Sequence, residues 1–455
     1  MNRTDIRYEF GGVREVWTVA YPLILSTASQ TVMQFMNRIF LSRHSADALA
    51  ACVPAGILSF MFACFFFGAV SYTNVFVAQF HGRERRAGIT SSLWQGVWLG
   101  ILSSAAIAAM TPVGLYIINS SGHAETVKTL ERQYFIILNL CGGLIPLNAA
   151  LSSFFTGRSK TRTTMIVNVL GNIVNIALTW IMVFGLGPVP SLGIRGAALG
   201  LVAGNLVITA SFLFLILSRV NRVRYRTLRL LAFNSRLFWK LVKFGAPSGI
   251  GFLLDVASFT VFVFLVGNTD SATLAANNII MSINMLAFMP VLGIGMATTT
   301  LVGQYIGKSM KDTAAKAVWS ALKLSLAYAL TLGFMFFLVP DIFIAIFGIP
   351  GSPDFAAIRA TALPLMRVLS FLILFDAVAI IFGDAIKGAG DTRFQMIAAA
   401  ACAWLLLVPG VYFLLQMHFS IVYVWSWVTF YLAVVAGVFC MRFRSGRWMK
   451  IDIME

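Results

Sequence analysis

Two aspartates lie near the middle of long apolar segments, where a charged side chain is unexpected. Asp255 lies within the segment 251–259 and Asp376 within 371–380, and the other residues of both segments are apolar or small. An aspartate at the centre of a bilayer costs about 3 kcal/mol. Such a carboxylate is typical of a proton relay, an ion site or a counter-charge for a substrate. The alternative is a structural polar contact between helices, worth about 1 kcal/mol.

The two carboxylates could carry either H⁺ or Na⁺. A carboxyl in apolar surroundings can take up a proton from one side of a membrane and release it on the other. Its oxygens also suit Na⁺, a hard cation, if amide or backbone oxygens complete the shell. Candidate ligands follow in the next apolar segment: Asn277, Asn278, Ser282 and Asn284. Asn277 and Asn278 could instead be hydrogen-bond partners between helices. No other cofactor and no metal site are expected.

Aromatic and sulfur side chains near the aspartates could form a substrate cavity. Phe252, Phe259 and Phe262 flank Asp255 and could stack on a cationic compound. A stripe at helical spacing could offer a soft, adaptable surface for varied compounds; it consists of Met281, Met285 and Met289. Both sets are more typical of packing between helices.

The composition is that of a helical protein with many membrane spans. Hydrophobic residues make up 59% of the chain and charged residues 11%, whereas soluble chains carry about 25% charged residues. Apolar segments long enough to cross a hydrocarbon core about 30 Å thick recur along the whole chain. We expect twelve spans near residues 16–41, 48–80, 90–118, 132–156, 164–187, 193–218, 239–267, 274–305, 317–347, 360–386, 394–415 and 420–441.

The net charge of +17 is distributed as in a membrane protein rather than a nucleic-acid-binding protein. Most Lys and Arg residues fall in the even-numbered loops and at the termini, with clusters at 83–86, 158–162, 219–243, 308–316 and 442–450. This positive-inside pattern predicts that both termini are cytoplasmic. No nucleic-acid partner is expected, and the expected partner of the basic and apolar surfaces is the lipid bilayer.

The chain contains an internal repeat. A shift of 225 residues aligns Pro22 with Pro247, Gly68 with Gly293, Thr73 with Thr298 and Gln79 with Gln304, and a shift of 231 aligns Gly157 with Gly388. The repeat predicts two six-helix lobes at 1–218 and 239–455, joined by a basic cytoplasmic linker at 219–238. Because each half has an even number of spans, both halves should enter the membrane from the same side and have parallel topology. Parallel repeats of this kind are typical of transport by alternating access.

The repeat also isolates what the halves do not share. Asp255 corresponds to Gln30 and Asp376 to Ile145, so only the C-terminal half carries deep carboxylates. Packing alone would favour similar residues at equivalent positions. The asymmetry therefore points to function.

Several motifs in this order resemble the multidrug and toxic compound extrusion (MATE) family, and its NorM-like branch in particular. The motifs are Gln34–Phe40, Val77–Gly82, Gly245–Gly249 with Asp255, and Phe375-Asp376 with Lys387–Arg393. The resemblance implies a multidrug exporter that exchanges amphipathic, often cationic, organic compounds for Na⁺ or H⁺. It assigns the coupling cation to the acids of the seventh and tenth helices, here Asp255 and Asp376.

The N-terminal half departs from the family pattern. Many members hold an aspartate in the first helix, where this chain has Asn37. Others hold an Asn and an Asp in the fifth helix, which Asn175 and Thr179 resemble. Such a polar site would carry no fixed charge and could not be protonated. We therefore expect coupling in the C-terminal half.

Other marks predict structural roles. The spacing of Gly196, Gly200 and Gly204 is typical of close helix packing. Asp391 is typical of a helix N-cap, and Asp384 is expected to pair with Lys387 at a cytoplasmic end. Gly303–Ser309 is one residue short of a P-loop and follows no strand, which argues against an ATPase.

Two other functions deserve comparison with export. A lipid or lipid-linked oligosaccharide flippase of the same superfamily typically has fourteen spans or an arginine-lined cavity. A membrane-embedded lipid enzyme would need clustered His, Asp or Arg at one membrane face, and the sequence has none, so no enzymatic activity is expected. We expect a monomeric, multi-pass protein of a bacterial inner membrane with small-molecule substrates.

Overall fold

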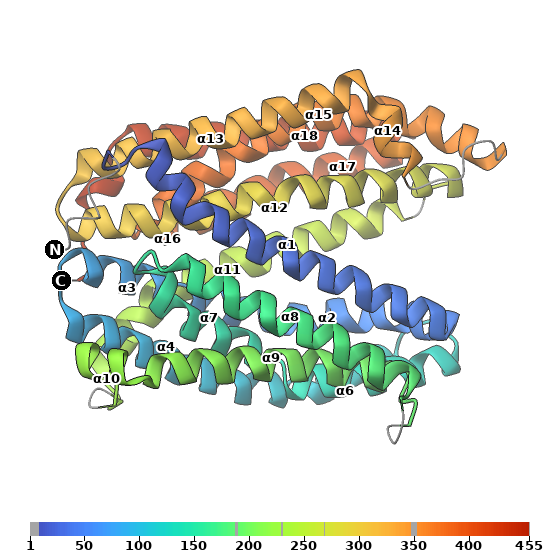
Figure 1. Ribbon diagram of the computed structural model, residues 1–455. Coiled ribbons are helices and arrows are strands. Elements are labelled where there is room, and N and C mark those ends of the chain that lie inside the picture. Colours follow the sequence, from blue (N-terminus) through green and yellow to red (C-terminus); the bar gives the residue numbers. More distant parts are fainter. Residues whose placement is uncertain (1–8, 187–189, 229–230, 268, 347–352, 455) are drawn as a thin grey trace. The chain divides into compact units, whose positions relative to one another are not determined.

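The computed structural model describes residues 9–186, 190–228, 231–267, 269–346 and 353–454, and they are almost entirely helical (Figure 1). No strand forms in these ranges beyond an isolated bridge at Leu186. The predicted all-α class is therefore confirmed. The predicted spans 164–187 and 317–347 each end on a residue outside the described ranges. Residues 229–230 of the predicted linker also lie outside them.

The N-terminal half contains ten helices among the described residues. They are α1 (Val13–His44), α2 (Ala46–Ser71), α3 (Thr73–Gly82), α4 (Arg86–Ala109), α5 (Thr111–Asn119), α6 (Glu125–Leu140), α7 (Leu144–Thr156), α8 (Thr161–Phe184), α9 (Ile194–Leu217) and α10 (Arg219–Tyr225).

The C-terminal half repeats this pattern with longer helices. They are α11 (Ser235–Val266), α12 (Ser271–Gly307), α13 (Lys311–Leu338), α14 (Pro340–Ala345), α15 (Pro353–Ala389), α16 (Thr392–Cys402), a π-helical turn (Ala403–Leu407), α17 (Val408–Gln416) and α18 (Ile421–Arg444). A short 3₁₀ helix at Arg447–Lys450 follows.

Eleven helical segments of the described chain are long and apolar enough to span a membrane, and each coincides with a predicted span. The remaining predicted span, 16–41, falls on α1, which has 32 residues. This helix is long enough to cross a bilayer, but serines, threonines, glutamines and Asn37 interrupt its apolar surface. α1 therefore needs polar partners along its length.

Equivalent prolines lie at the start of the short helices that follow α4 and α13. Pro112 is the second residue of α5, and Pro340 is the first residue of α14. A proline has no N–H to donate to the preceding turn and its ring clashes there, so it ends one helix and is tolerated at the start of the next. The repeat thus reappears as the same interruption in both halves.

The described chain forms two compact units, each described here by itself. The N-unit comprises Leu25–Leu253, and the C-unit comprises the residues up to Ile24 together with those from Leu254 onward. The unit boundaries therefore differ from the repeat boundaries predicted at 218 and 239. The difference arises because α1 and α11, the first helices of the two halves, each belong partly to one unit and partly to the other.

Equivalent glycines explain how the first helices divide. In the N-unit, a Cβ added at Gly68 would lie 2.9 Å from Cα of Gly249 on α11. In the C-unit, a Cβ added at Gly293 would lie 2.8 Å from the backbone N of Ile24 on α1. Gly68 corresponds to Gly293, and Ile24 to Gly249, by the shift of 225. The same contact is therefore made twice, and each time by the first helix of the opposite half.

A second pair of equivalent glycines joins helices inside each unit. A Cβ on Gly157 would meet the carbonyl oxygen of Asn74 at 2.9 Å, and one on Gly388 would meet the carbonyl oxygen of Thr299 at 2.6 Å. Because Asn74 and Thr299 are also repeat equivalents, both units bring two helices together with no room for a side chain.

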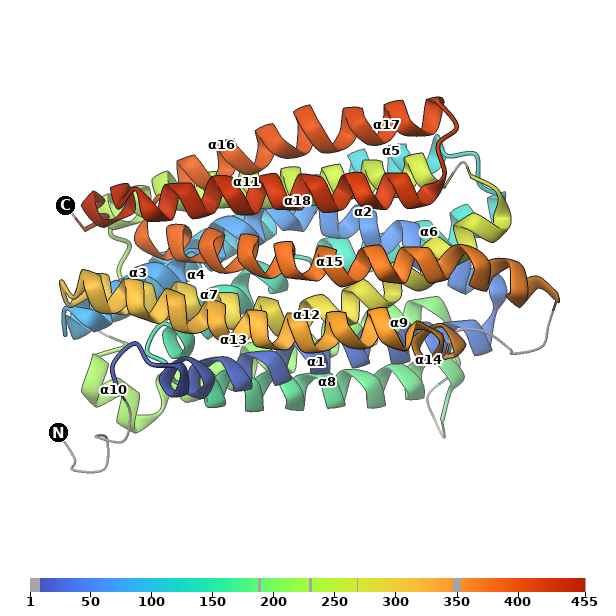
Figure 2. The same ribbon diagram turned by 90° about the horizontal axis from the view of Figure 1, so that it is seen from above.

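α15 is the central helix of the C-unit. It packs against α12, α13 and α18, and the view from above shows it between α18 and α13 (Figure 2). Two apolar clusters surround it, one containing Phe382 and Trp448 and the other Leu369 and Trp425. The middle of α15, where Asp376 lies, is therefore packed against neighbouring helices on several sides.

Two smaller sequence predictions have different outcomes. The glycine ladder is confirmed as close packing, because Cβ atoms on Gly196, Gly200 and Gly204 would each come within 2.6 Å of α8.

The prediction that the side chain of Asp391 caps a helix is wrong. Asp391 precedes α16, but it makes no side-chain cap; its carboxylate accepts a hydrogen bond from Nε of Arg442 at 2.7 Å. A charged partner outcompetes the backbone amides for a buried carboxylate.

Gly157→Val and Gly388→Val should each destabilise the protein by about 1–3 kcal/mol, because the added side chain meets a neighbouring backbone. Thermal unfolding of the purified protein measures the effect. Gly437→Val is the matched control, since a Cβ on Gly437 meets nothing within 4 Å. Equal melting temperatures for all three variants would contradict the packing assigned to these glycines.

Candidate functional site

Asp255 and Asp376 lie inside spanning helices and have no fixed partner. Asp255 is on α11, where it is exposed, and Asp376 is on α15, where it is half-buried. Among the described residues, no ion pair and no hydrogen bond holds either carboxylate. A carboxylate in a span is normally paired unless it has a binding role. Both acids are thus free to accept a cation.

Tyr431 on α18 interacts electrostatically with both acids. Its hydroxyl lies within electrostatic range of both Asp255 and Asp376, and Lys387 on α15 lies within electrostatic range of Asp255. The structure therefore brings the two predicted residues into one neighbourhood of the C-unit, built from α11, α15 and α18. Sequence analysis missed Tyr431, because a tyrosine in an aromatic-rich span carries no signal of its own.

The repeat positions of the two acids have matching burial in the N-unit. Gln30, the counterpart of Asp255, is also exposed, and Ile145, the counterpart of Asp376, is also half-buried. The fold therefore offers equivalent environments in both halves. What distinguishes the C-unit is the placement of carboxylates in them.

Asp384 is a third carboxylate on α15, and its environment differs from the predicted interfacial pair. It lies five residues before the end of α15, and a Cβ on Gly295 of α12 would come within 2.2 Å of its Oδ2. The hydroxyl of Thr299 donates to its backbone oxygen at 3.0 Å. Lys387 does interact electrostatically with Asp384, but the carboxylate itself rests on α12, where only a glycine leaves room.

The four predicted ligands on α12 are not gathered into one site. Asn277 is buried, and its Oδ1 accepts a hydrogen bond from Nε1 of Trp425 at 3.0 Å. Asn278 and Ser282 are exposed, and the hydroxyl of Ser282 donates to the carbonyl of Asn278 at 2.8 Å. Asn284 is half-buried, and its Oδ1 has no partner. Of the four, Asn284 has the amide oxygen best able to accept a cation.

The predicted aromatic residues divide between packing and exposure. Phe252 makes edge and tilted contacts with Phe60 and Phe67 inside the N-unit. Phe262 is 5% exposed and lies in the core of the C-unit. Phe259 is 53% exposed and stacks on Phe262 at a centroid distance of 6.4 Å. Phe259 is therefore the exposed member of the three.

The methionine stripe on α12 is likewise mixed. Met281 packs against the core around α15, Met289 is half-buried, and Met285 is 43% exposed. Met285 and Phe259 are thus the exposed members of the two predicted cavity sets.

A ladder of neutral polar pairs joins α1 to α8 in the N-unit. Nδ2 of Asn37 donates to Oδ1 of Asn175 at 3.1 Å. Two further pairs run along the same helices: Asn168 Nδ2 to Ser26 Oγ at 2.7 Å and Asn172 Nδ2 to Ser29 Oγ at 2.8 Å. These bonds supply the partners that the polar surface of α1 requires.

The predicted N-terminal polar site lies at one end of this ladder. Asn37 and Asn175 are directly bonded, and Thr179 follows one turn later on α8. All three are buried, and Oδ1 of Asn37 and Oγ1 of Thr179 have no partner. The site offers neutral oxygens only, consistent with its expected lack of charge.

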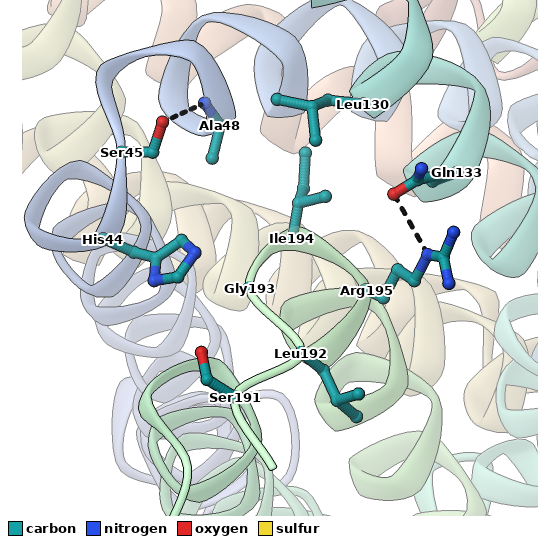
Figure 3. A pocket seen from close by; sticks show the side chains of 10 residues that line it. All are labelled: His44, Ser45, Ala48, Leu130, Gln133, Ser191, Leu192, Gly193, Ile194 and Arg195. Atoms are coloured by element: carbon teal, nitrogen blue, oxygen red, sulfur yellow. Dashed lines mark hydrogen bonds between the residues drawn. The ribbon is translucent and has the colours of Figure 1, made fainter.

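A pocket of about 350 Å³ opens in the N-unit away from every predicted site residue. It lies at the end of α1 and the starts of α2 and α9 (Figure 3), and its lining includes His44, Ser45, Gln133, Gly193 and Arg195. Nε of Arg195 donates to Oε1 of Gln133 at 3.0 Å. None of the predicted site residues lines the pocket, although His44 follows Asn37 by seven residues on α1.

Comparison with known sequences places both halves in one family. A family model described as MatE matches residues 22–181 and 247–413, which include Asp255 and Asp376. A protein of Thermotoga maritima named probable multidrug resistance protein NorM is 25% identical, over 97% of this chain and 94% of its own. A protein of Bradyrhizobium diazoefficiens with the same name is 28% identical, over 94% of this chain and 92% of its own.

Solved structures share the fold. A crystal structure of a MATE protein in complex with MaL6 superimposes with a TM-score of 0.86 at 18% identity, covering 96% of this chain and 97% of that one. A MOP superfamily transporter from Pyrococcus furiosus gives 0.85 at 20% identity, covering 97% of both chains. The predicted twelve-helix architecture in two pseudo-symmetric six-helix lobes is confirmed by this likeness.

The Asn37–Asn175 bond should contribute about 1 kcal/mol to stability, the size typical of polar contacts between membrane helices. A double-mutant cycle of Asn37→Ala and Asn175→Ala, read by reversible unfolding, measures the coupling energy. Asn37→Ala combined with Asn139→Ala is the control, and it should be additive because Asn139 is bonded to the carbonyl of Ile107 and the hydroxyl of Thr111 and shares no partner with Asn37. Additivity in the Asn37–Asn175 cycle would contradict the ladder.

Proposed function

Because the chain belongs to the MatE family, we propose that it is a secondary active exporter of amphipathic or cationic organic compounds, coupled to Na⁺ or H⁺. The observation that carries this proposal is the pair of unpaired carboxylates, Asp255 and Asp376, in spanning helices of the C-unit. The relatives named as multidrug resistance proteins support the substrate class.

The coupling cation would neutralise the carboxylates. With H⁺ or Na⁺ bound, the pair carries less negative charge, and a cationic substrate has less to bind. When the cation leaves, the negative charge returns and attracts the substrate. Competition for the same carboxylates is sufficient for exchange, because each ligand is favoured only when the other is absent.

The driving force is large enough to matter. When the exported compound carries no net charge, one coupling cation moving inward gains about 2.3 kcal/mol per 100 mV, equivalent to roughly a fiftyfold difference in accumulation. When a singly charged cation leaves for each cation that enters, no net charge moves, and the concentration gradient of the coupling ion supplies about 1.4 kcal/mol for each tenfold difference. A single coupling ion therefore supports useful export without ATP.

We assign coupling to the C-unit and a supporting role to the N-unit. Asn37 and Asn175 are already bonded to each other, and neither they nor Thr179 can take up a proton at physiological pH. Tyr431, which interacts electrostatically with both acids, and Asn284, whose Oδ1 has no hydrogen-bond partner, would supply further oxygens in the C-unit. No cofactor beyond the coupling ion is part of this proposal.

The proposed setting is a bacterial inner membrane with both termini in the cytoplasm. The basic clusters support this orientation by the positive-inside rule. The exported compounds would then move from the cytoplasmic side outward, and the working unit would be a monomer, since each chain contains both halves.

Drug efflux from proteoliposomes, with Na⁺ and pH gradients imposed separately, tests the proposal. Wild-type protein should respond to one of the two gradients. Asp376→Asn and Asp255→Asn should insert normally but lose gradient-driven accumulation, which for a singly charged compound amounts to up to roughly tenfold for each tenfold ion gradient imposed. Each variant keeps the shape of the side chain and removes only the carboxylate.

Asp341→Asn is the matched control. Asp341 lies outside the spanning helices, and its carboxylate is paired with Arg359 at 2.6 Å, which holds the pKa of Asp341 below its usual value. It should export like the wild type. Wild-type-like, gradient-dependent export by both the Asp255 and Asp376 variants would disprove the proposed mechanism.

A further inference from the structure

The connection between α9 and α11 is strongly basic and contains no acidic residue. From residue 196 to residue 254 the chain has no Asp or Glu, while Arg219, Arg222, Arg224, Arg226 and Arg236 follow closely on one another. All five arginines are exposed. Because α9 and α11 both span the membrane, their connection lies where the chain leaves the hydrocarbon core.

Hydrogen bonds fix this connection against α4. The hydroxyl of Thr90 donates to the carbonyl of Tyr225 at 2.8 Å, and Nε1 of Trp94 donates to the carbonyl of Thr227 at 2.8 Å. Nε1 of Trp98 reaches the carbonyl of Leu231 at 3.3 Å. α10 also contacts α9 and α4 at this end of the N-unit (Figure 1). The connection between α9 and α11 is therefore held in a defined orientation against α4.

Apolar side chains alternate with the arginines on this surface. Val220 and Val223 on α10 are both 73% exposed, and Phe233 is 53% exposed. Exposed valines beside arginines on a short helix are unfavourable in water. They suit the boundary between headgroups and acyl chains, where apolar groups enter the bilayer and cationic groups stay at the phosphates.

A buried arginine beneath α10 adds positive charge with no counter-ion. Arg158 is 5% exposed, and its Cζ lies 3.7 Å from the ring centre of Phe154 and 4.5 Å from that of Tyr225. Its Nε donates to the carbonyl of Phe154, and the side chain of Tyr225 is its other polar neighbour. Among the described residues no carboxylate forms an ion pair with Arg158. Burial lowers the pKa of Arg158, and nearby Arg224 adds to the effect.

An unpaired buried charge is costly, so Arg158 points to an anion at the adjacent surface. Its nitrogens are covered by the two rings, and the anion would therefore act on it through the electrostatic field rather than by direct contact. The exposed arginines of α10 are the groups that such an anion can touch.

We propose that α10 and its flanking residues, Arg219–Arg226, bind the phosphates of anionic phospholipids in the membrane leaflet they face. The arginines contact the headgroups, and Val220 and Val223 enter the acyl boundary. This surface is separate from the carboxylates of the C-unit, so the inference does not depend on the proposed transport function.

Two measurements on the full-length protein test the lipid surface. Native mass spectrometry gives the relative affinity for phosphatidylglycerol over phosphatidylcholine. It should fall by at least roughly tenfold when Arg219, Arg222, Arg224 and Arg226 are all changed to Gln, since each arginine contributes up to about 1 kcal/mol. Hydrogen–deuterium exchange in nanodiscs should show the amides of Arg219–Tyr225 protected in phosphatidylglycerol and less protected in phosphatidylcholine.

Two further variants separate lipid from other anions and from overall charge. Val220→Asn with Val223→Asn should weaken phosphatidylglycerol binding while leaving all the arginines in place. The charge-matched control changes four exposed basic residues of the C-unit to Gln: Lys311, Arg444, Arg447 and Lys450. It should keep the wild-type lipid preference.

Three results would overturn the proposal. One is equal affinity of the wild type for the two lipids, and another is an equal loss in the C-unit control. The third is protection of Arg219–Tyr225 by inorganic phosphate in phosphatidylcholine nanodiscs, which would identify a site for a free anion.

Discussion

The hydrocarbon core of a membrane offers no hydrogen-bond partner, so every polar group inside a span must find one on another helix, in a cavity or on a ligand. The polar groups of this chain meet that constraint in different ways. Some are bonded across helices, as Asn37 is to Asn175 and Trp425 to Asn277. Asp384 is accommodated against a glycine. Asp255 and Asp376 remain unpaired, and a cation is the ligand that would satisfy them.

The internal repeat makes this contrast sharper. The two halves repeat their glycine contacts and their proline breaks, and they give Gln30 and Asp255 the same exposure. Equivalent positions can be polar in either half and apolar in the other. Asn37 in the N-terminal half, for example, corresponds to Phe262, a core residue of the C-terminal half. One half thus uses its polar groups to hold α1, and the other presents free carboxylates. Exchange of ions for cargo needs only the second kind.

The sequence predicted what depends on local apolar length and on repetition. The spans, the helical class and the close packing at Gly196–Gly204 follow from patterns within one or two helices. It did not predict contacts set by helices far apart in the chain. Tyr431 beside both acids, Gly295 beneath Asp384 and Arg442 on Asp391 each depend on how α12, α15 and α18 pack. The division of α1 and α11 between units was missed for the same reason.

Release of the coupling ion on substrate binding tests the central claim most directly. Calorimetric titration of a transported drug into purified protein, in buffers of different ionisation enthalpy and with or without Na⁺, counts the H⁺ or Na⁺ released. The account predicts that the wild type releases a cation for each cationic drug bound, and that the double variant Asp255→Asn, Asp376→Asn releases none. Equal release by the double variant and the wild type would contradict it.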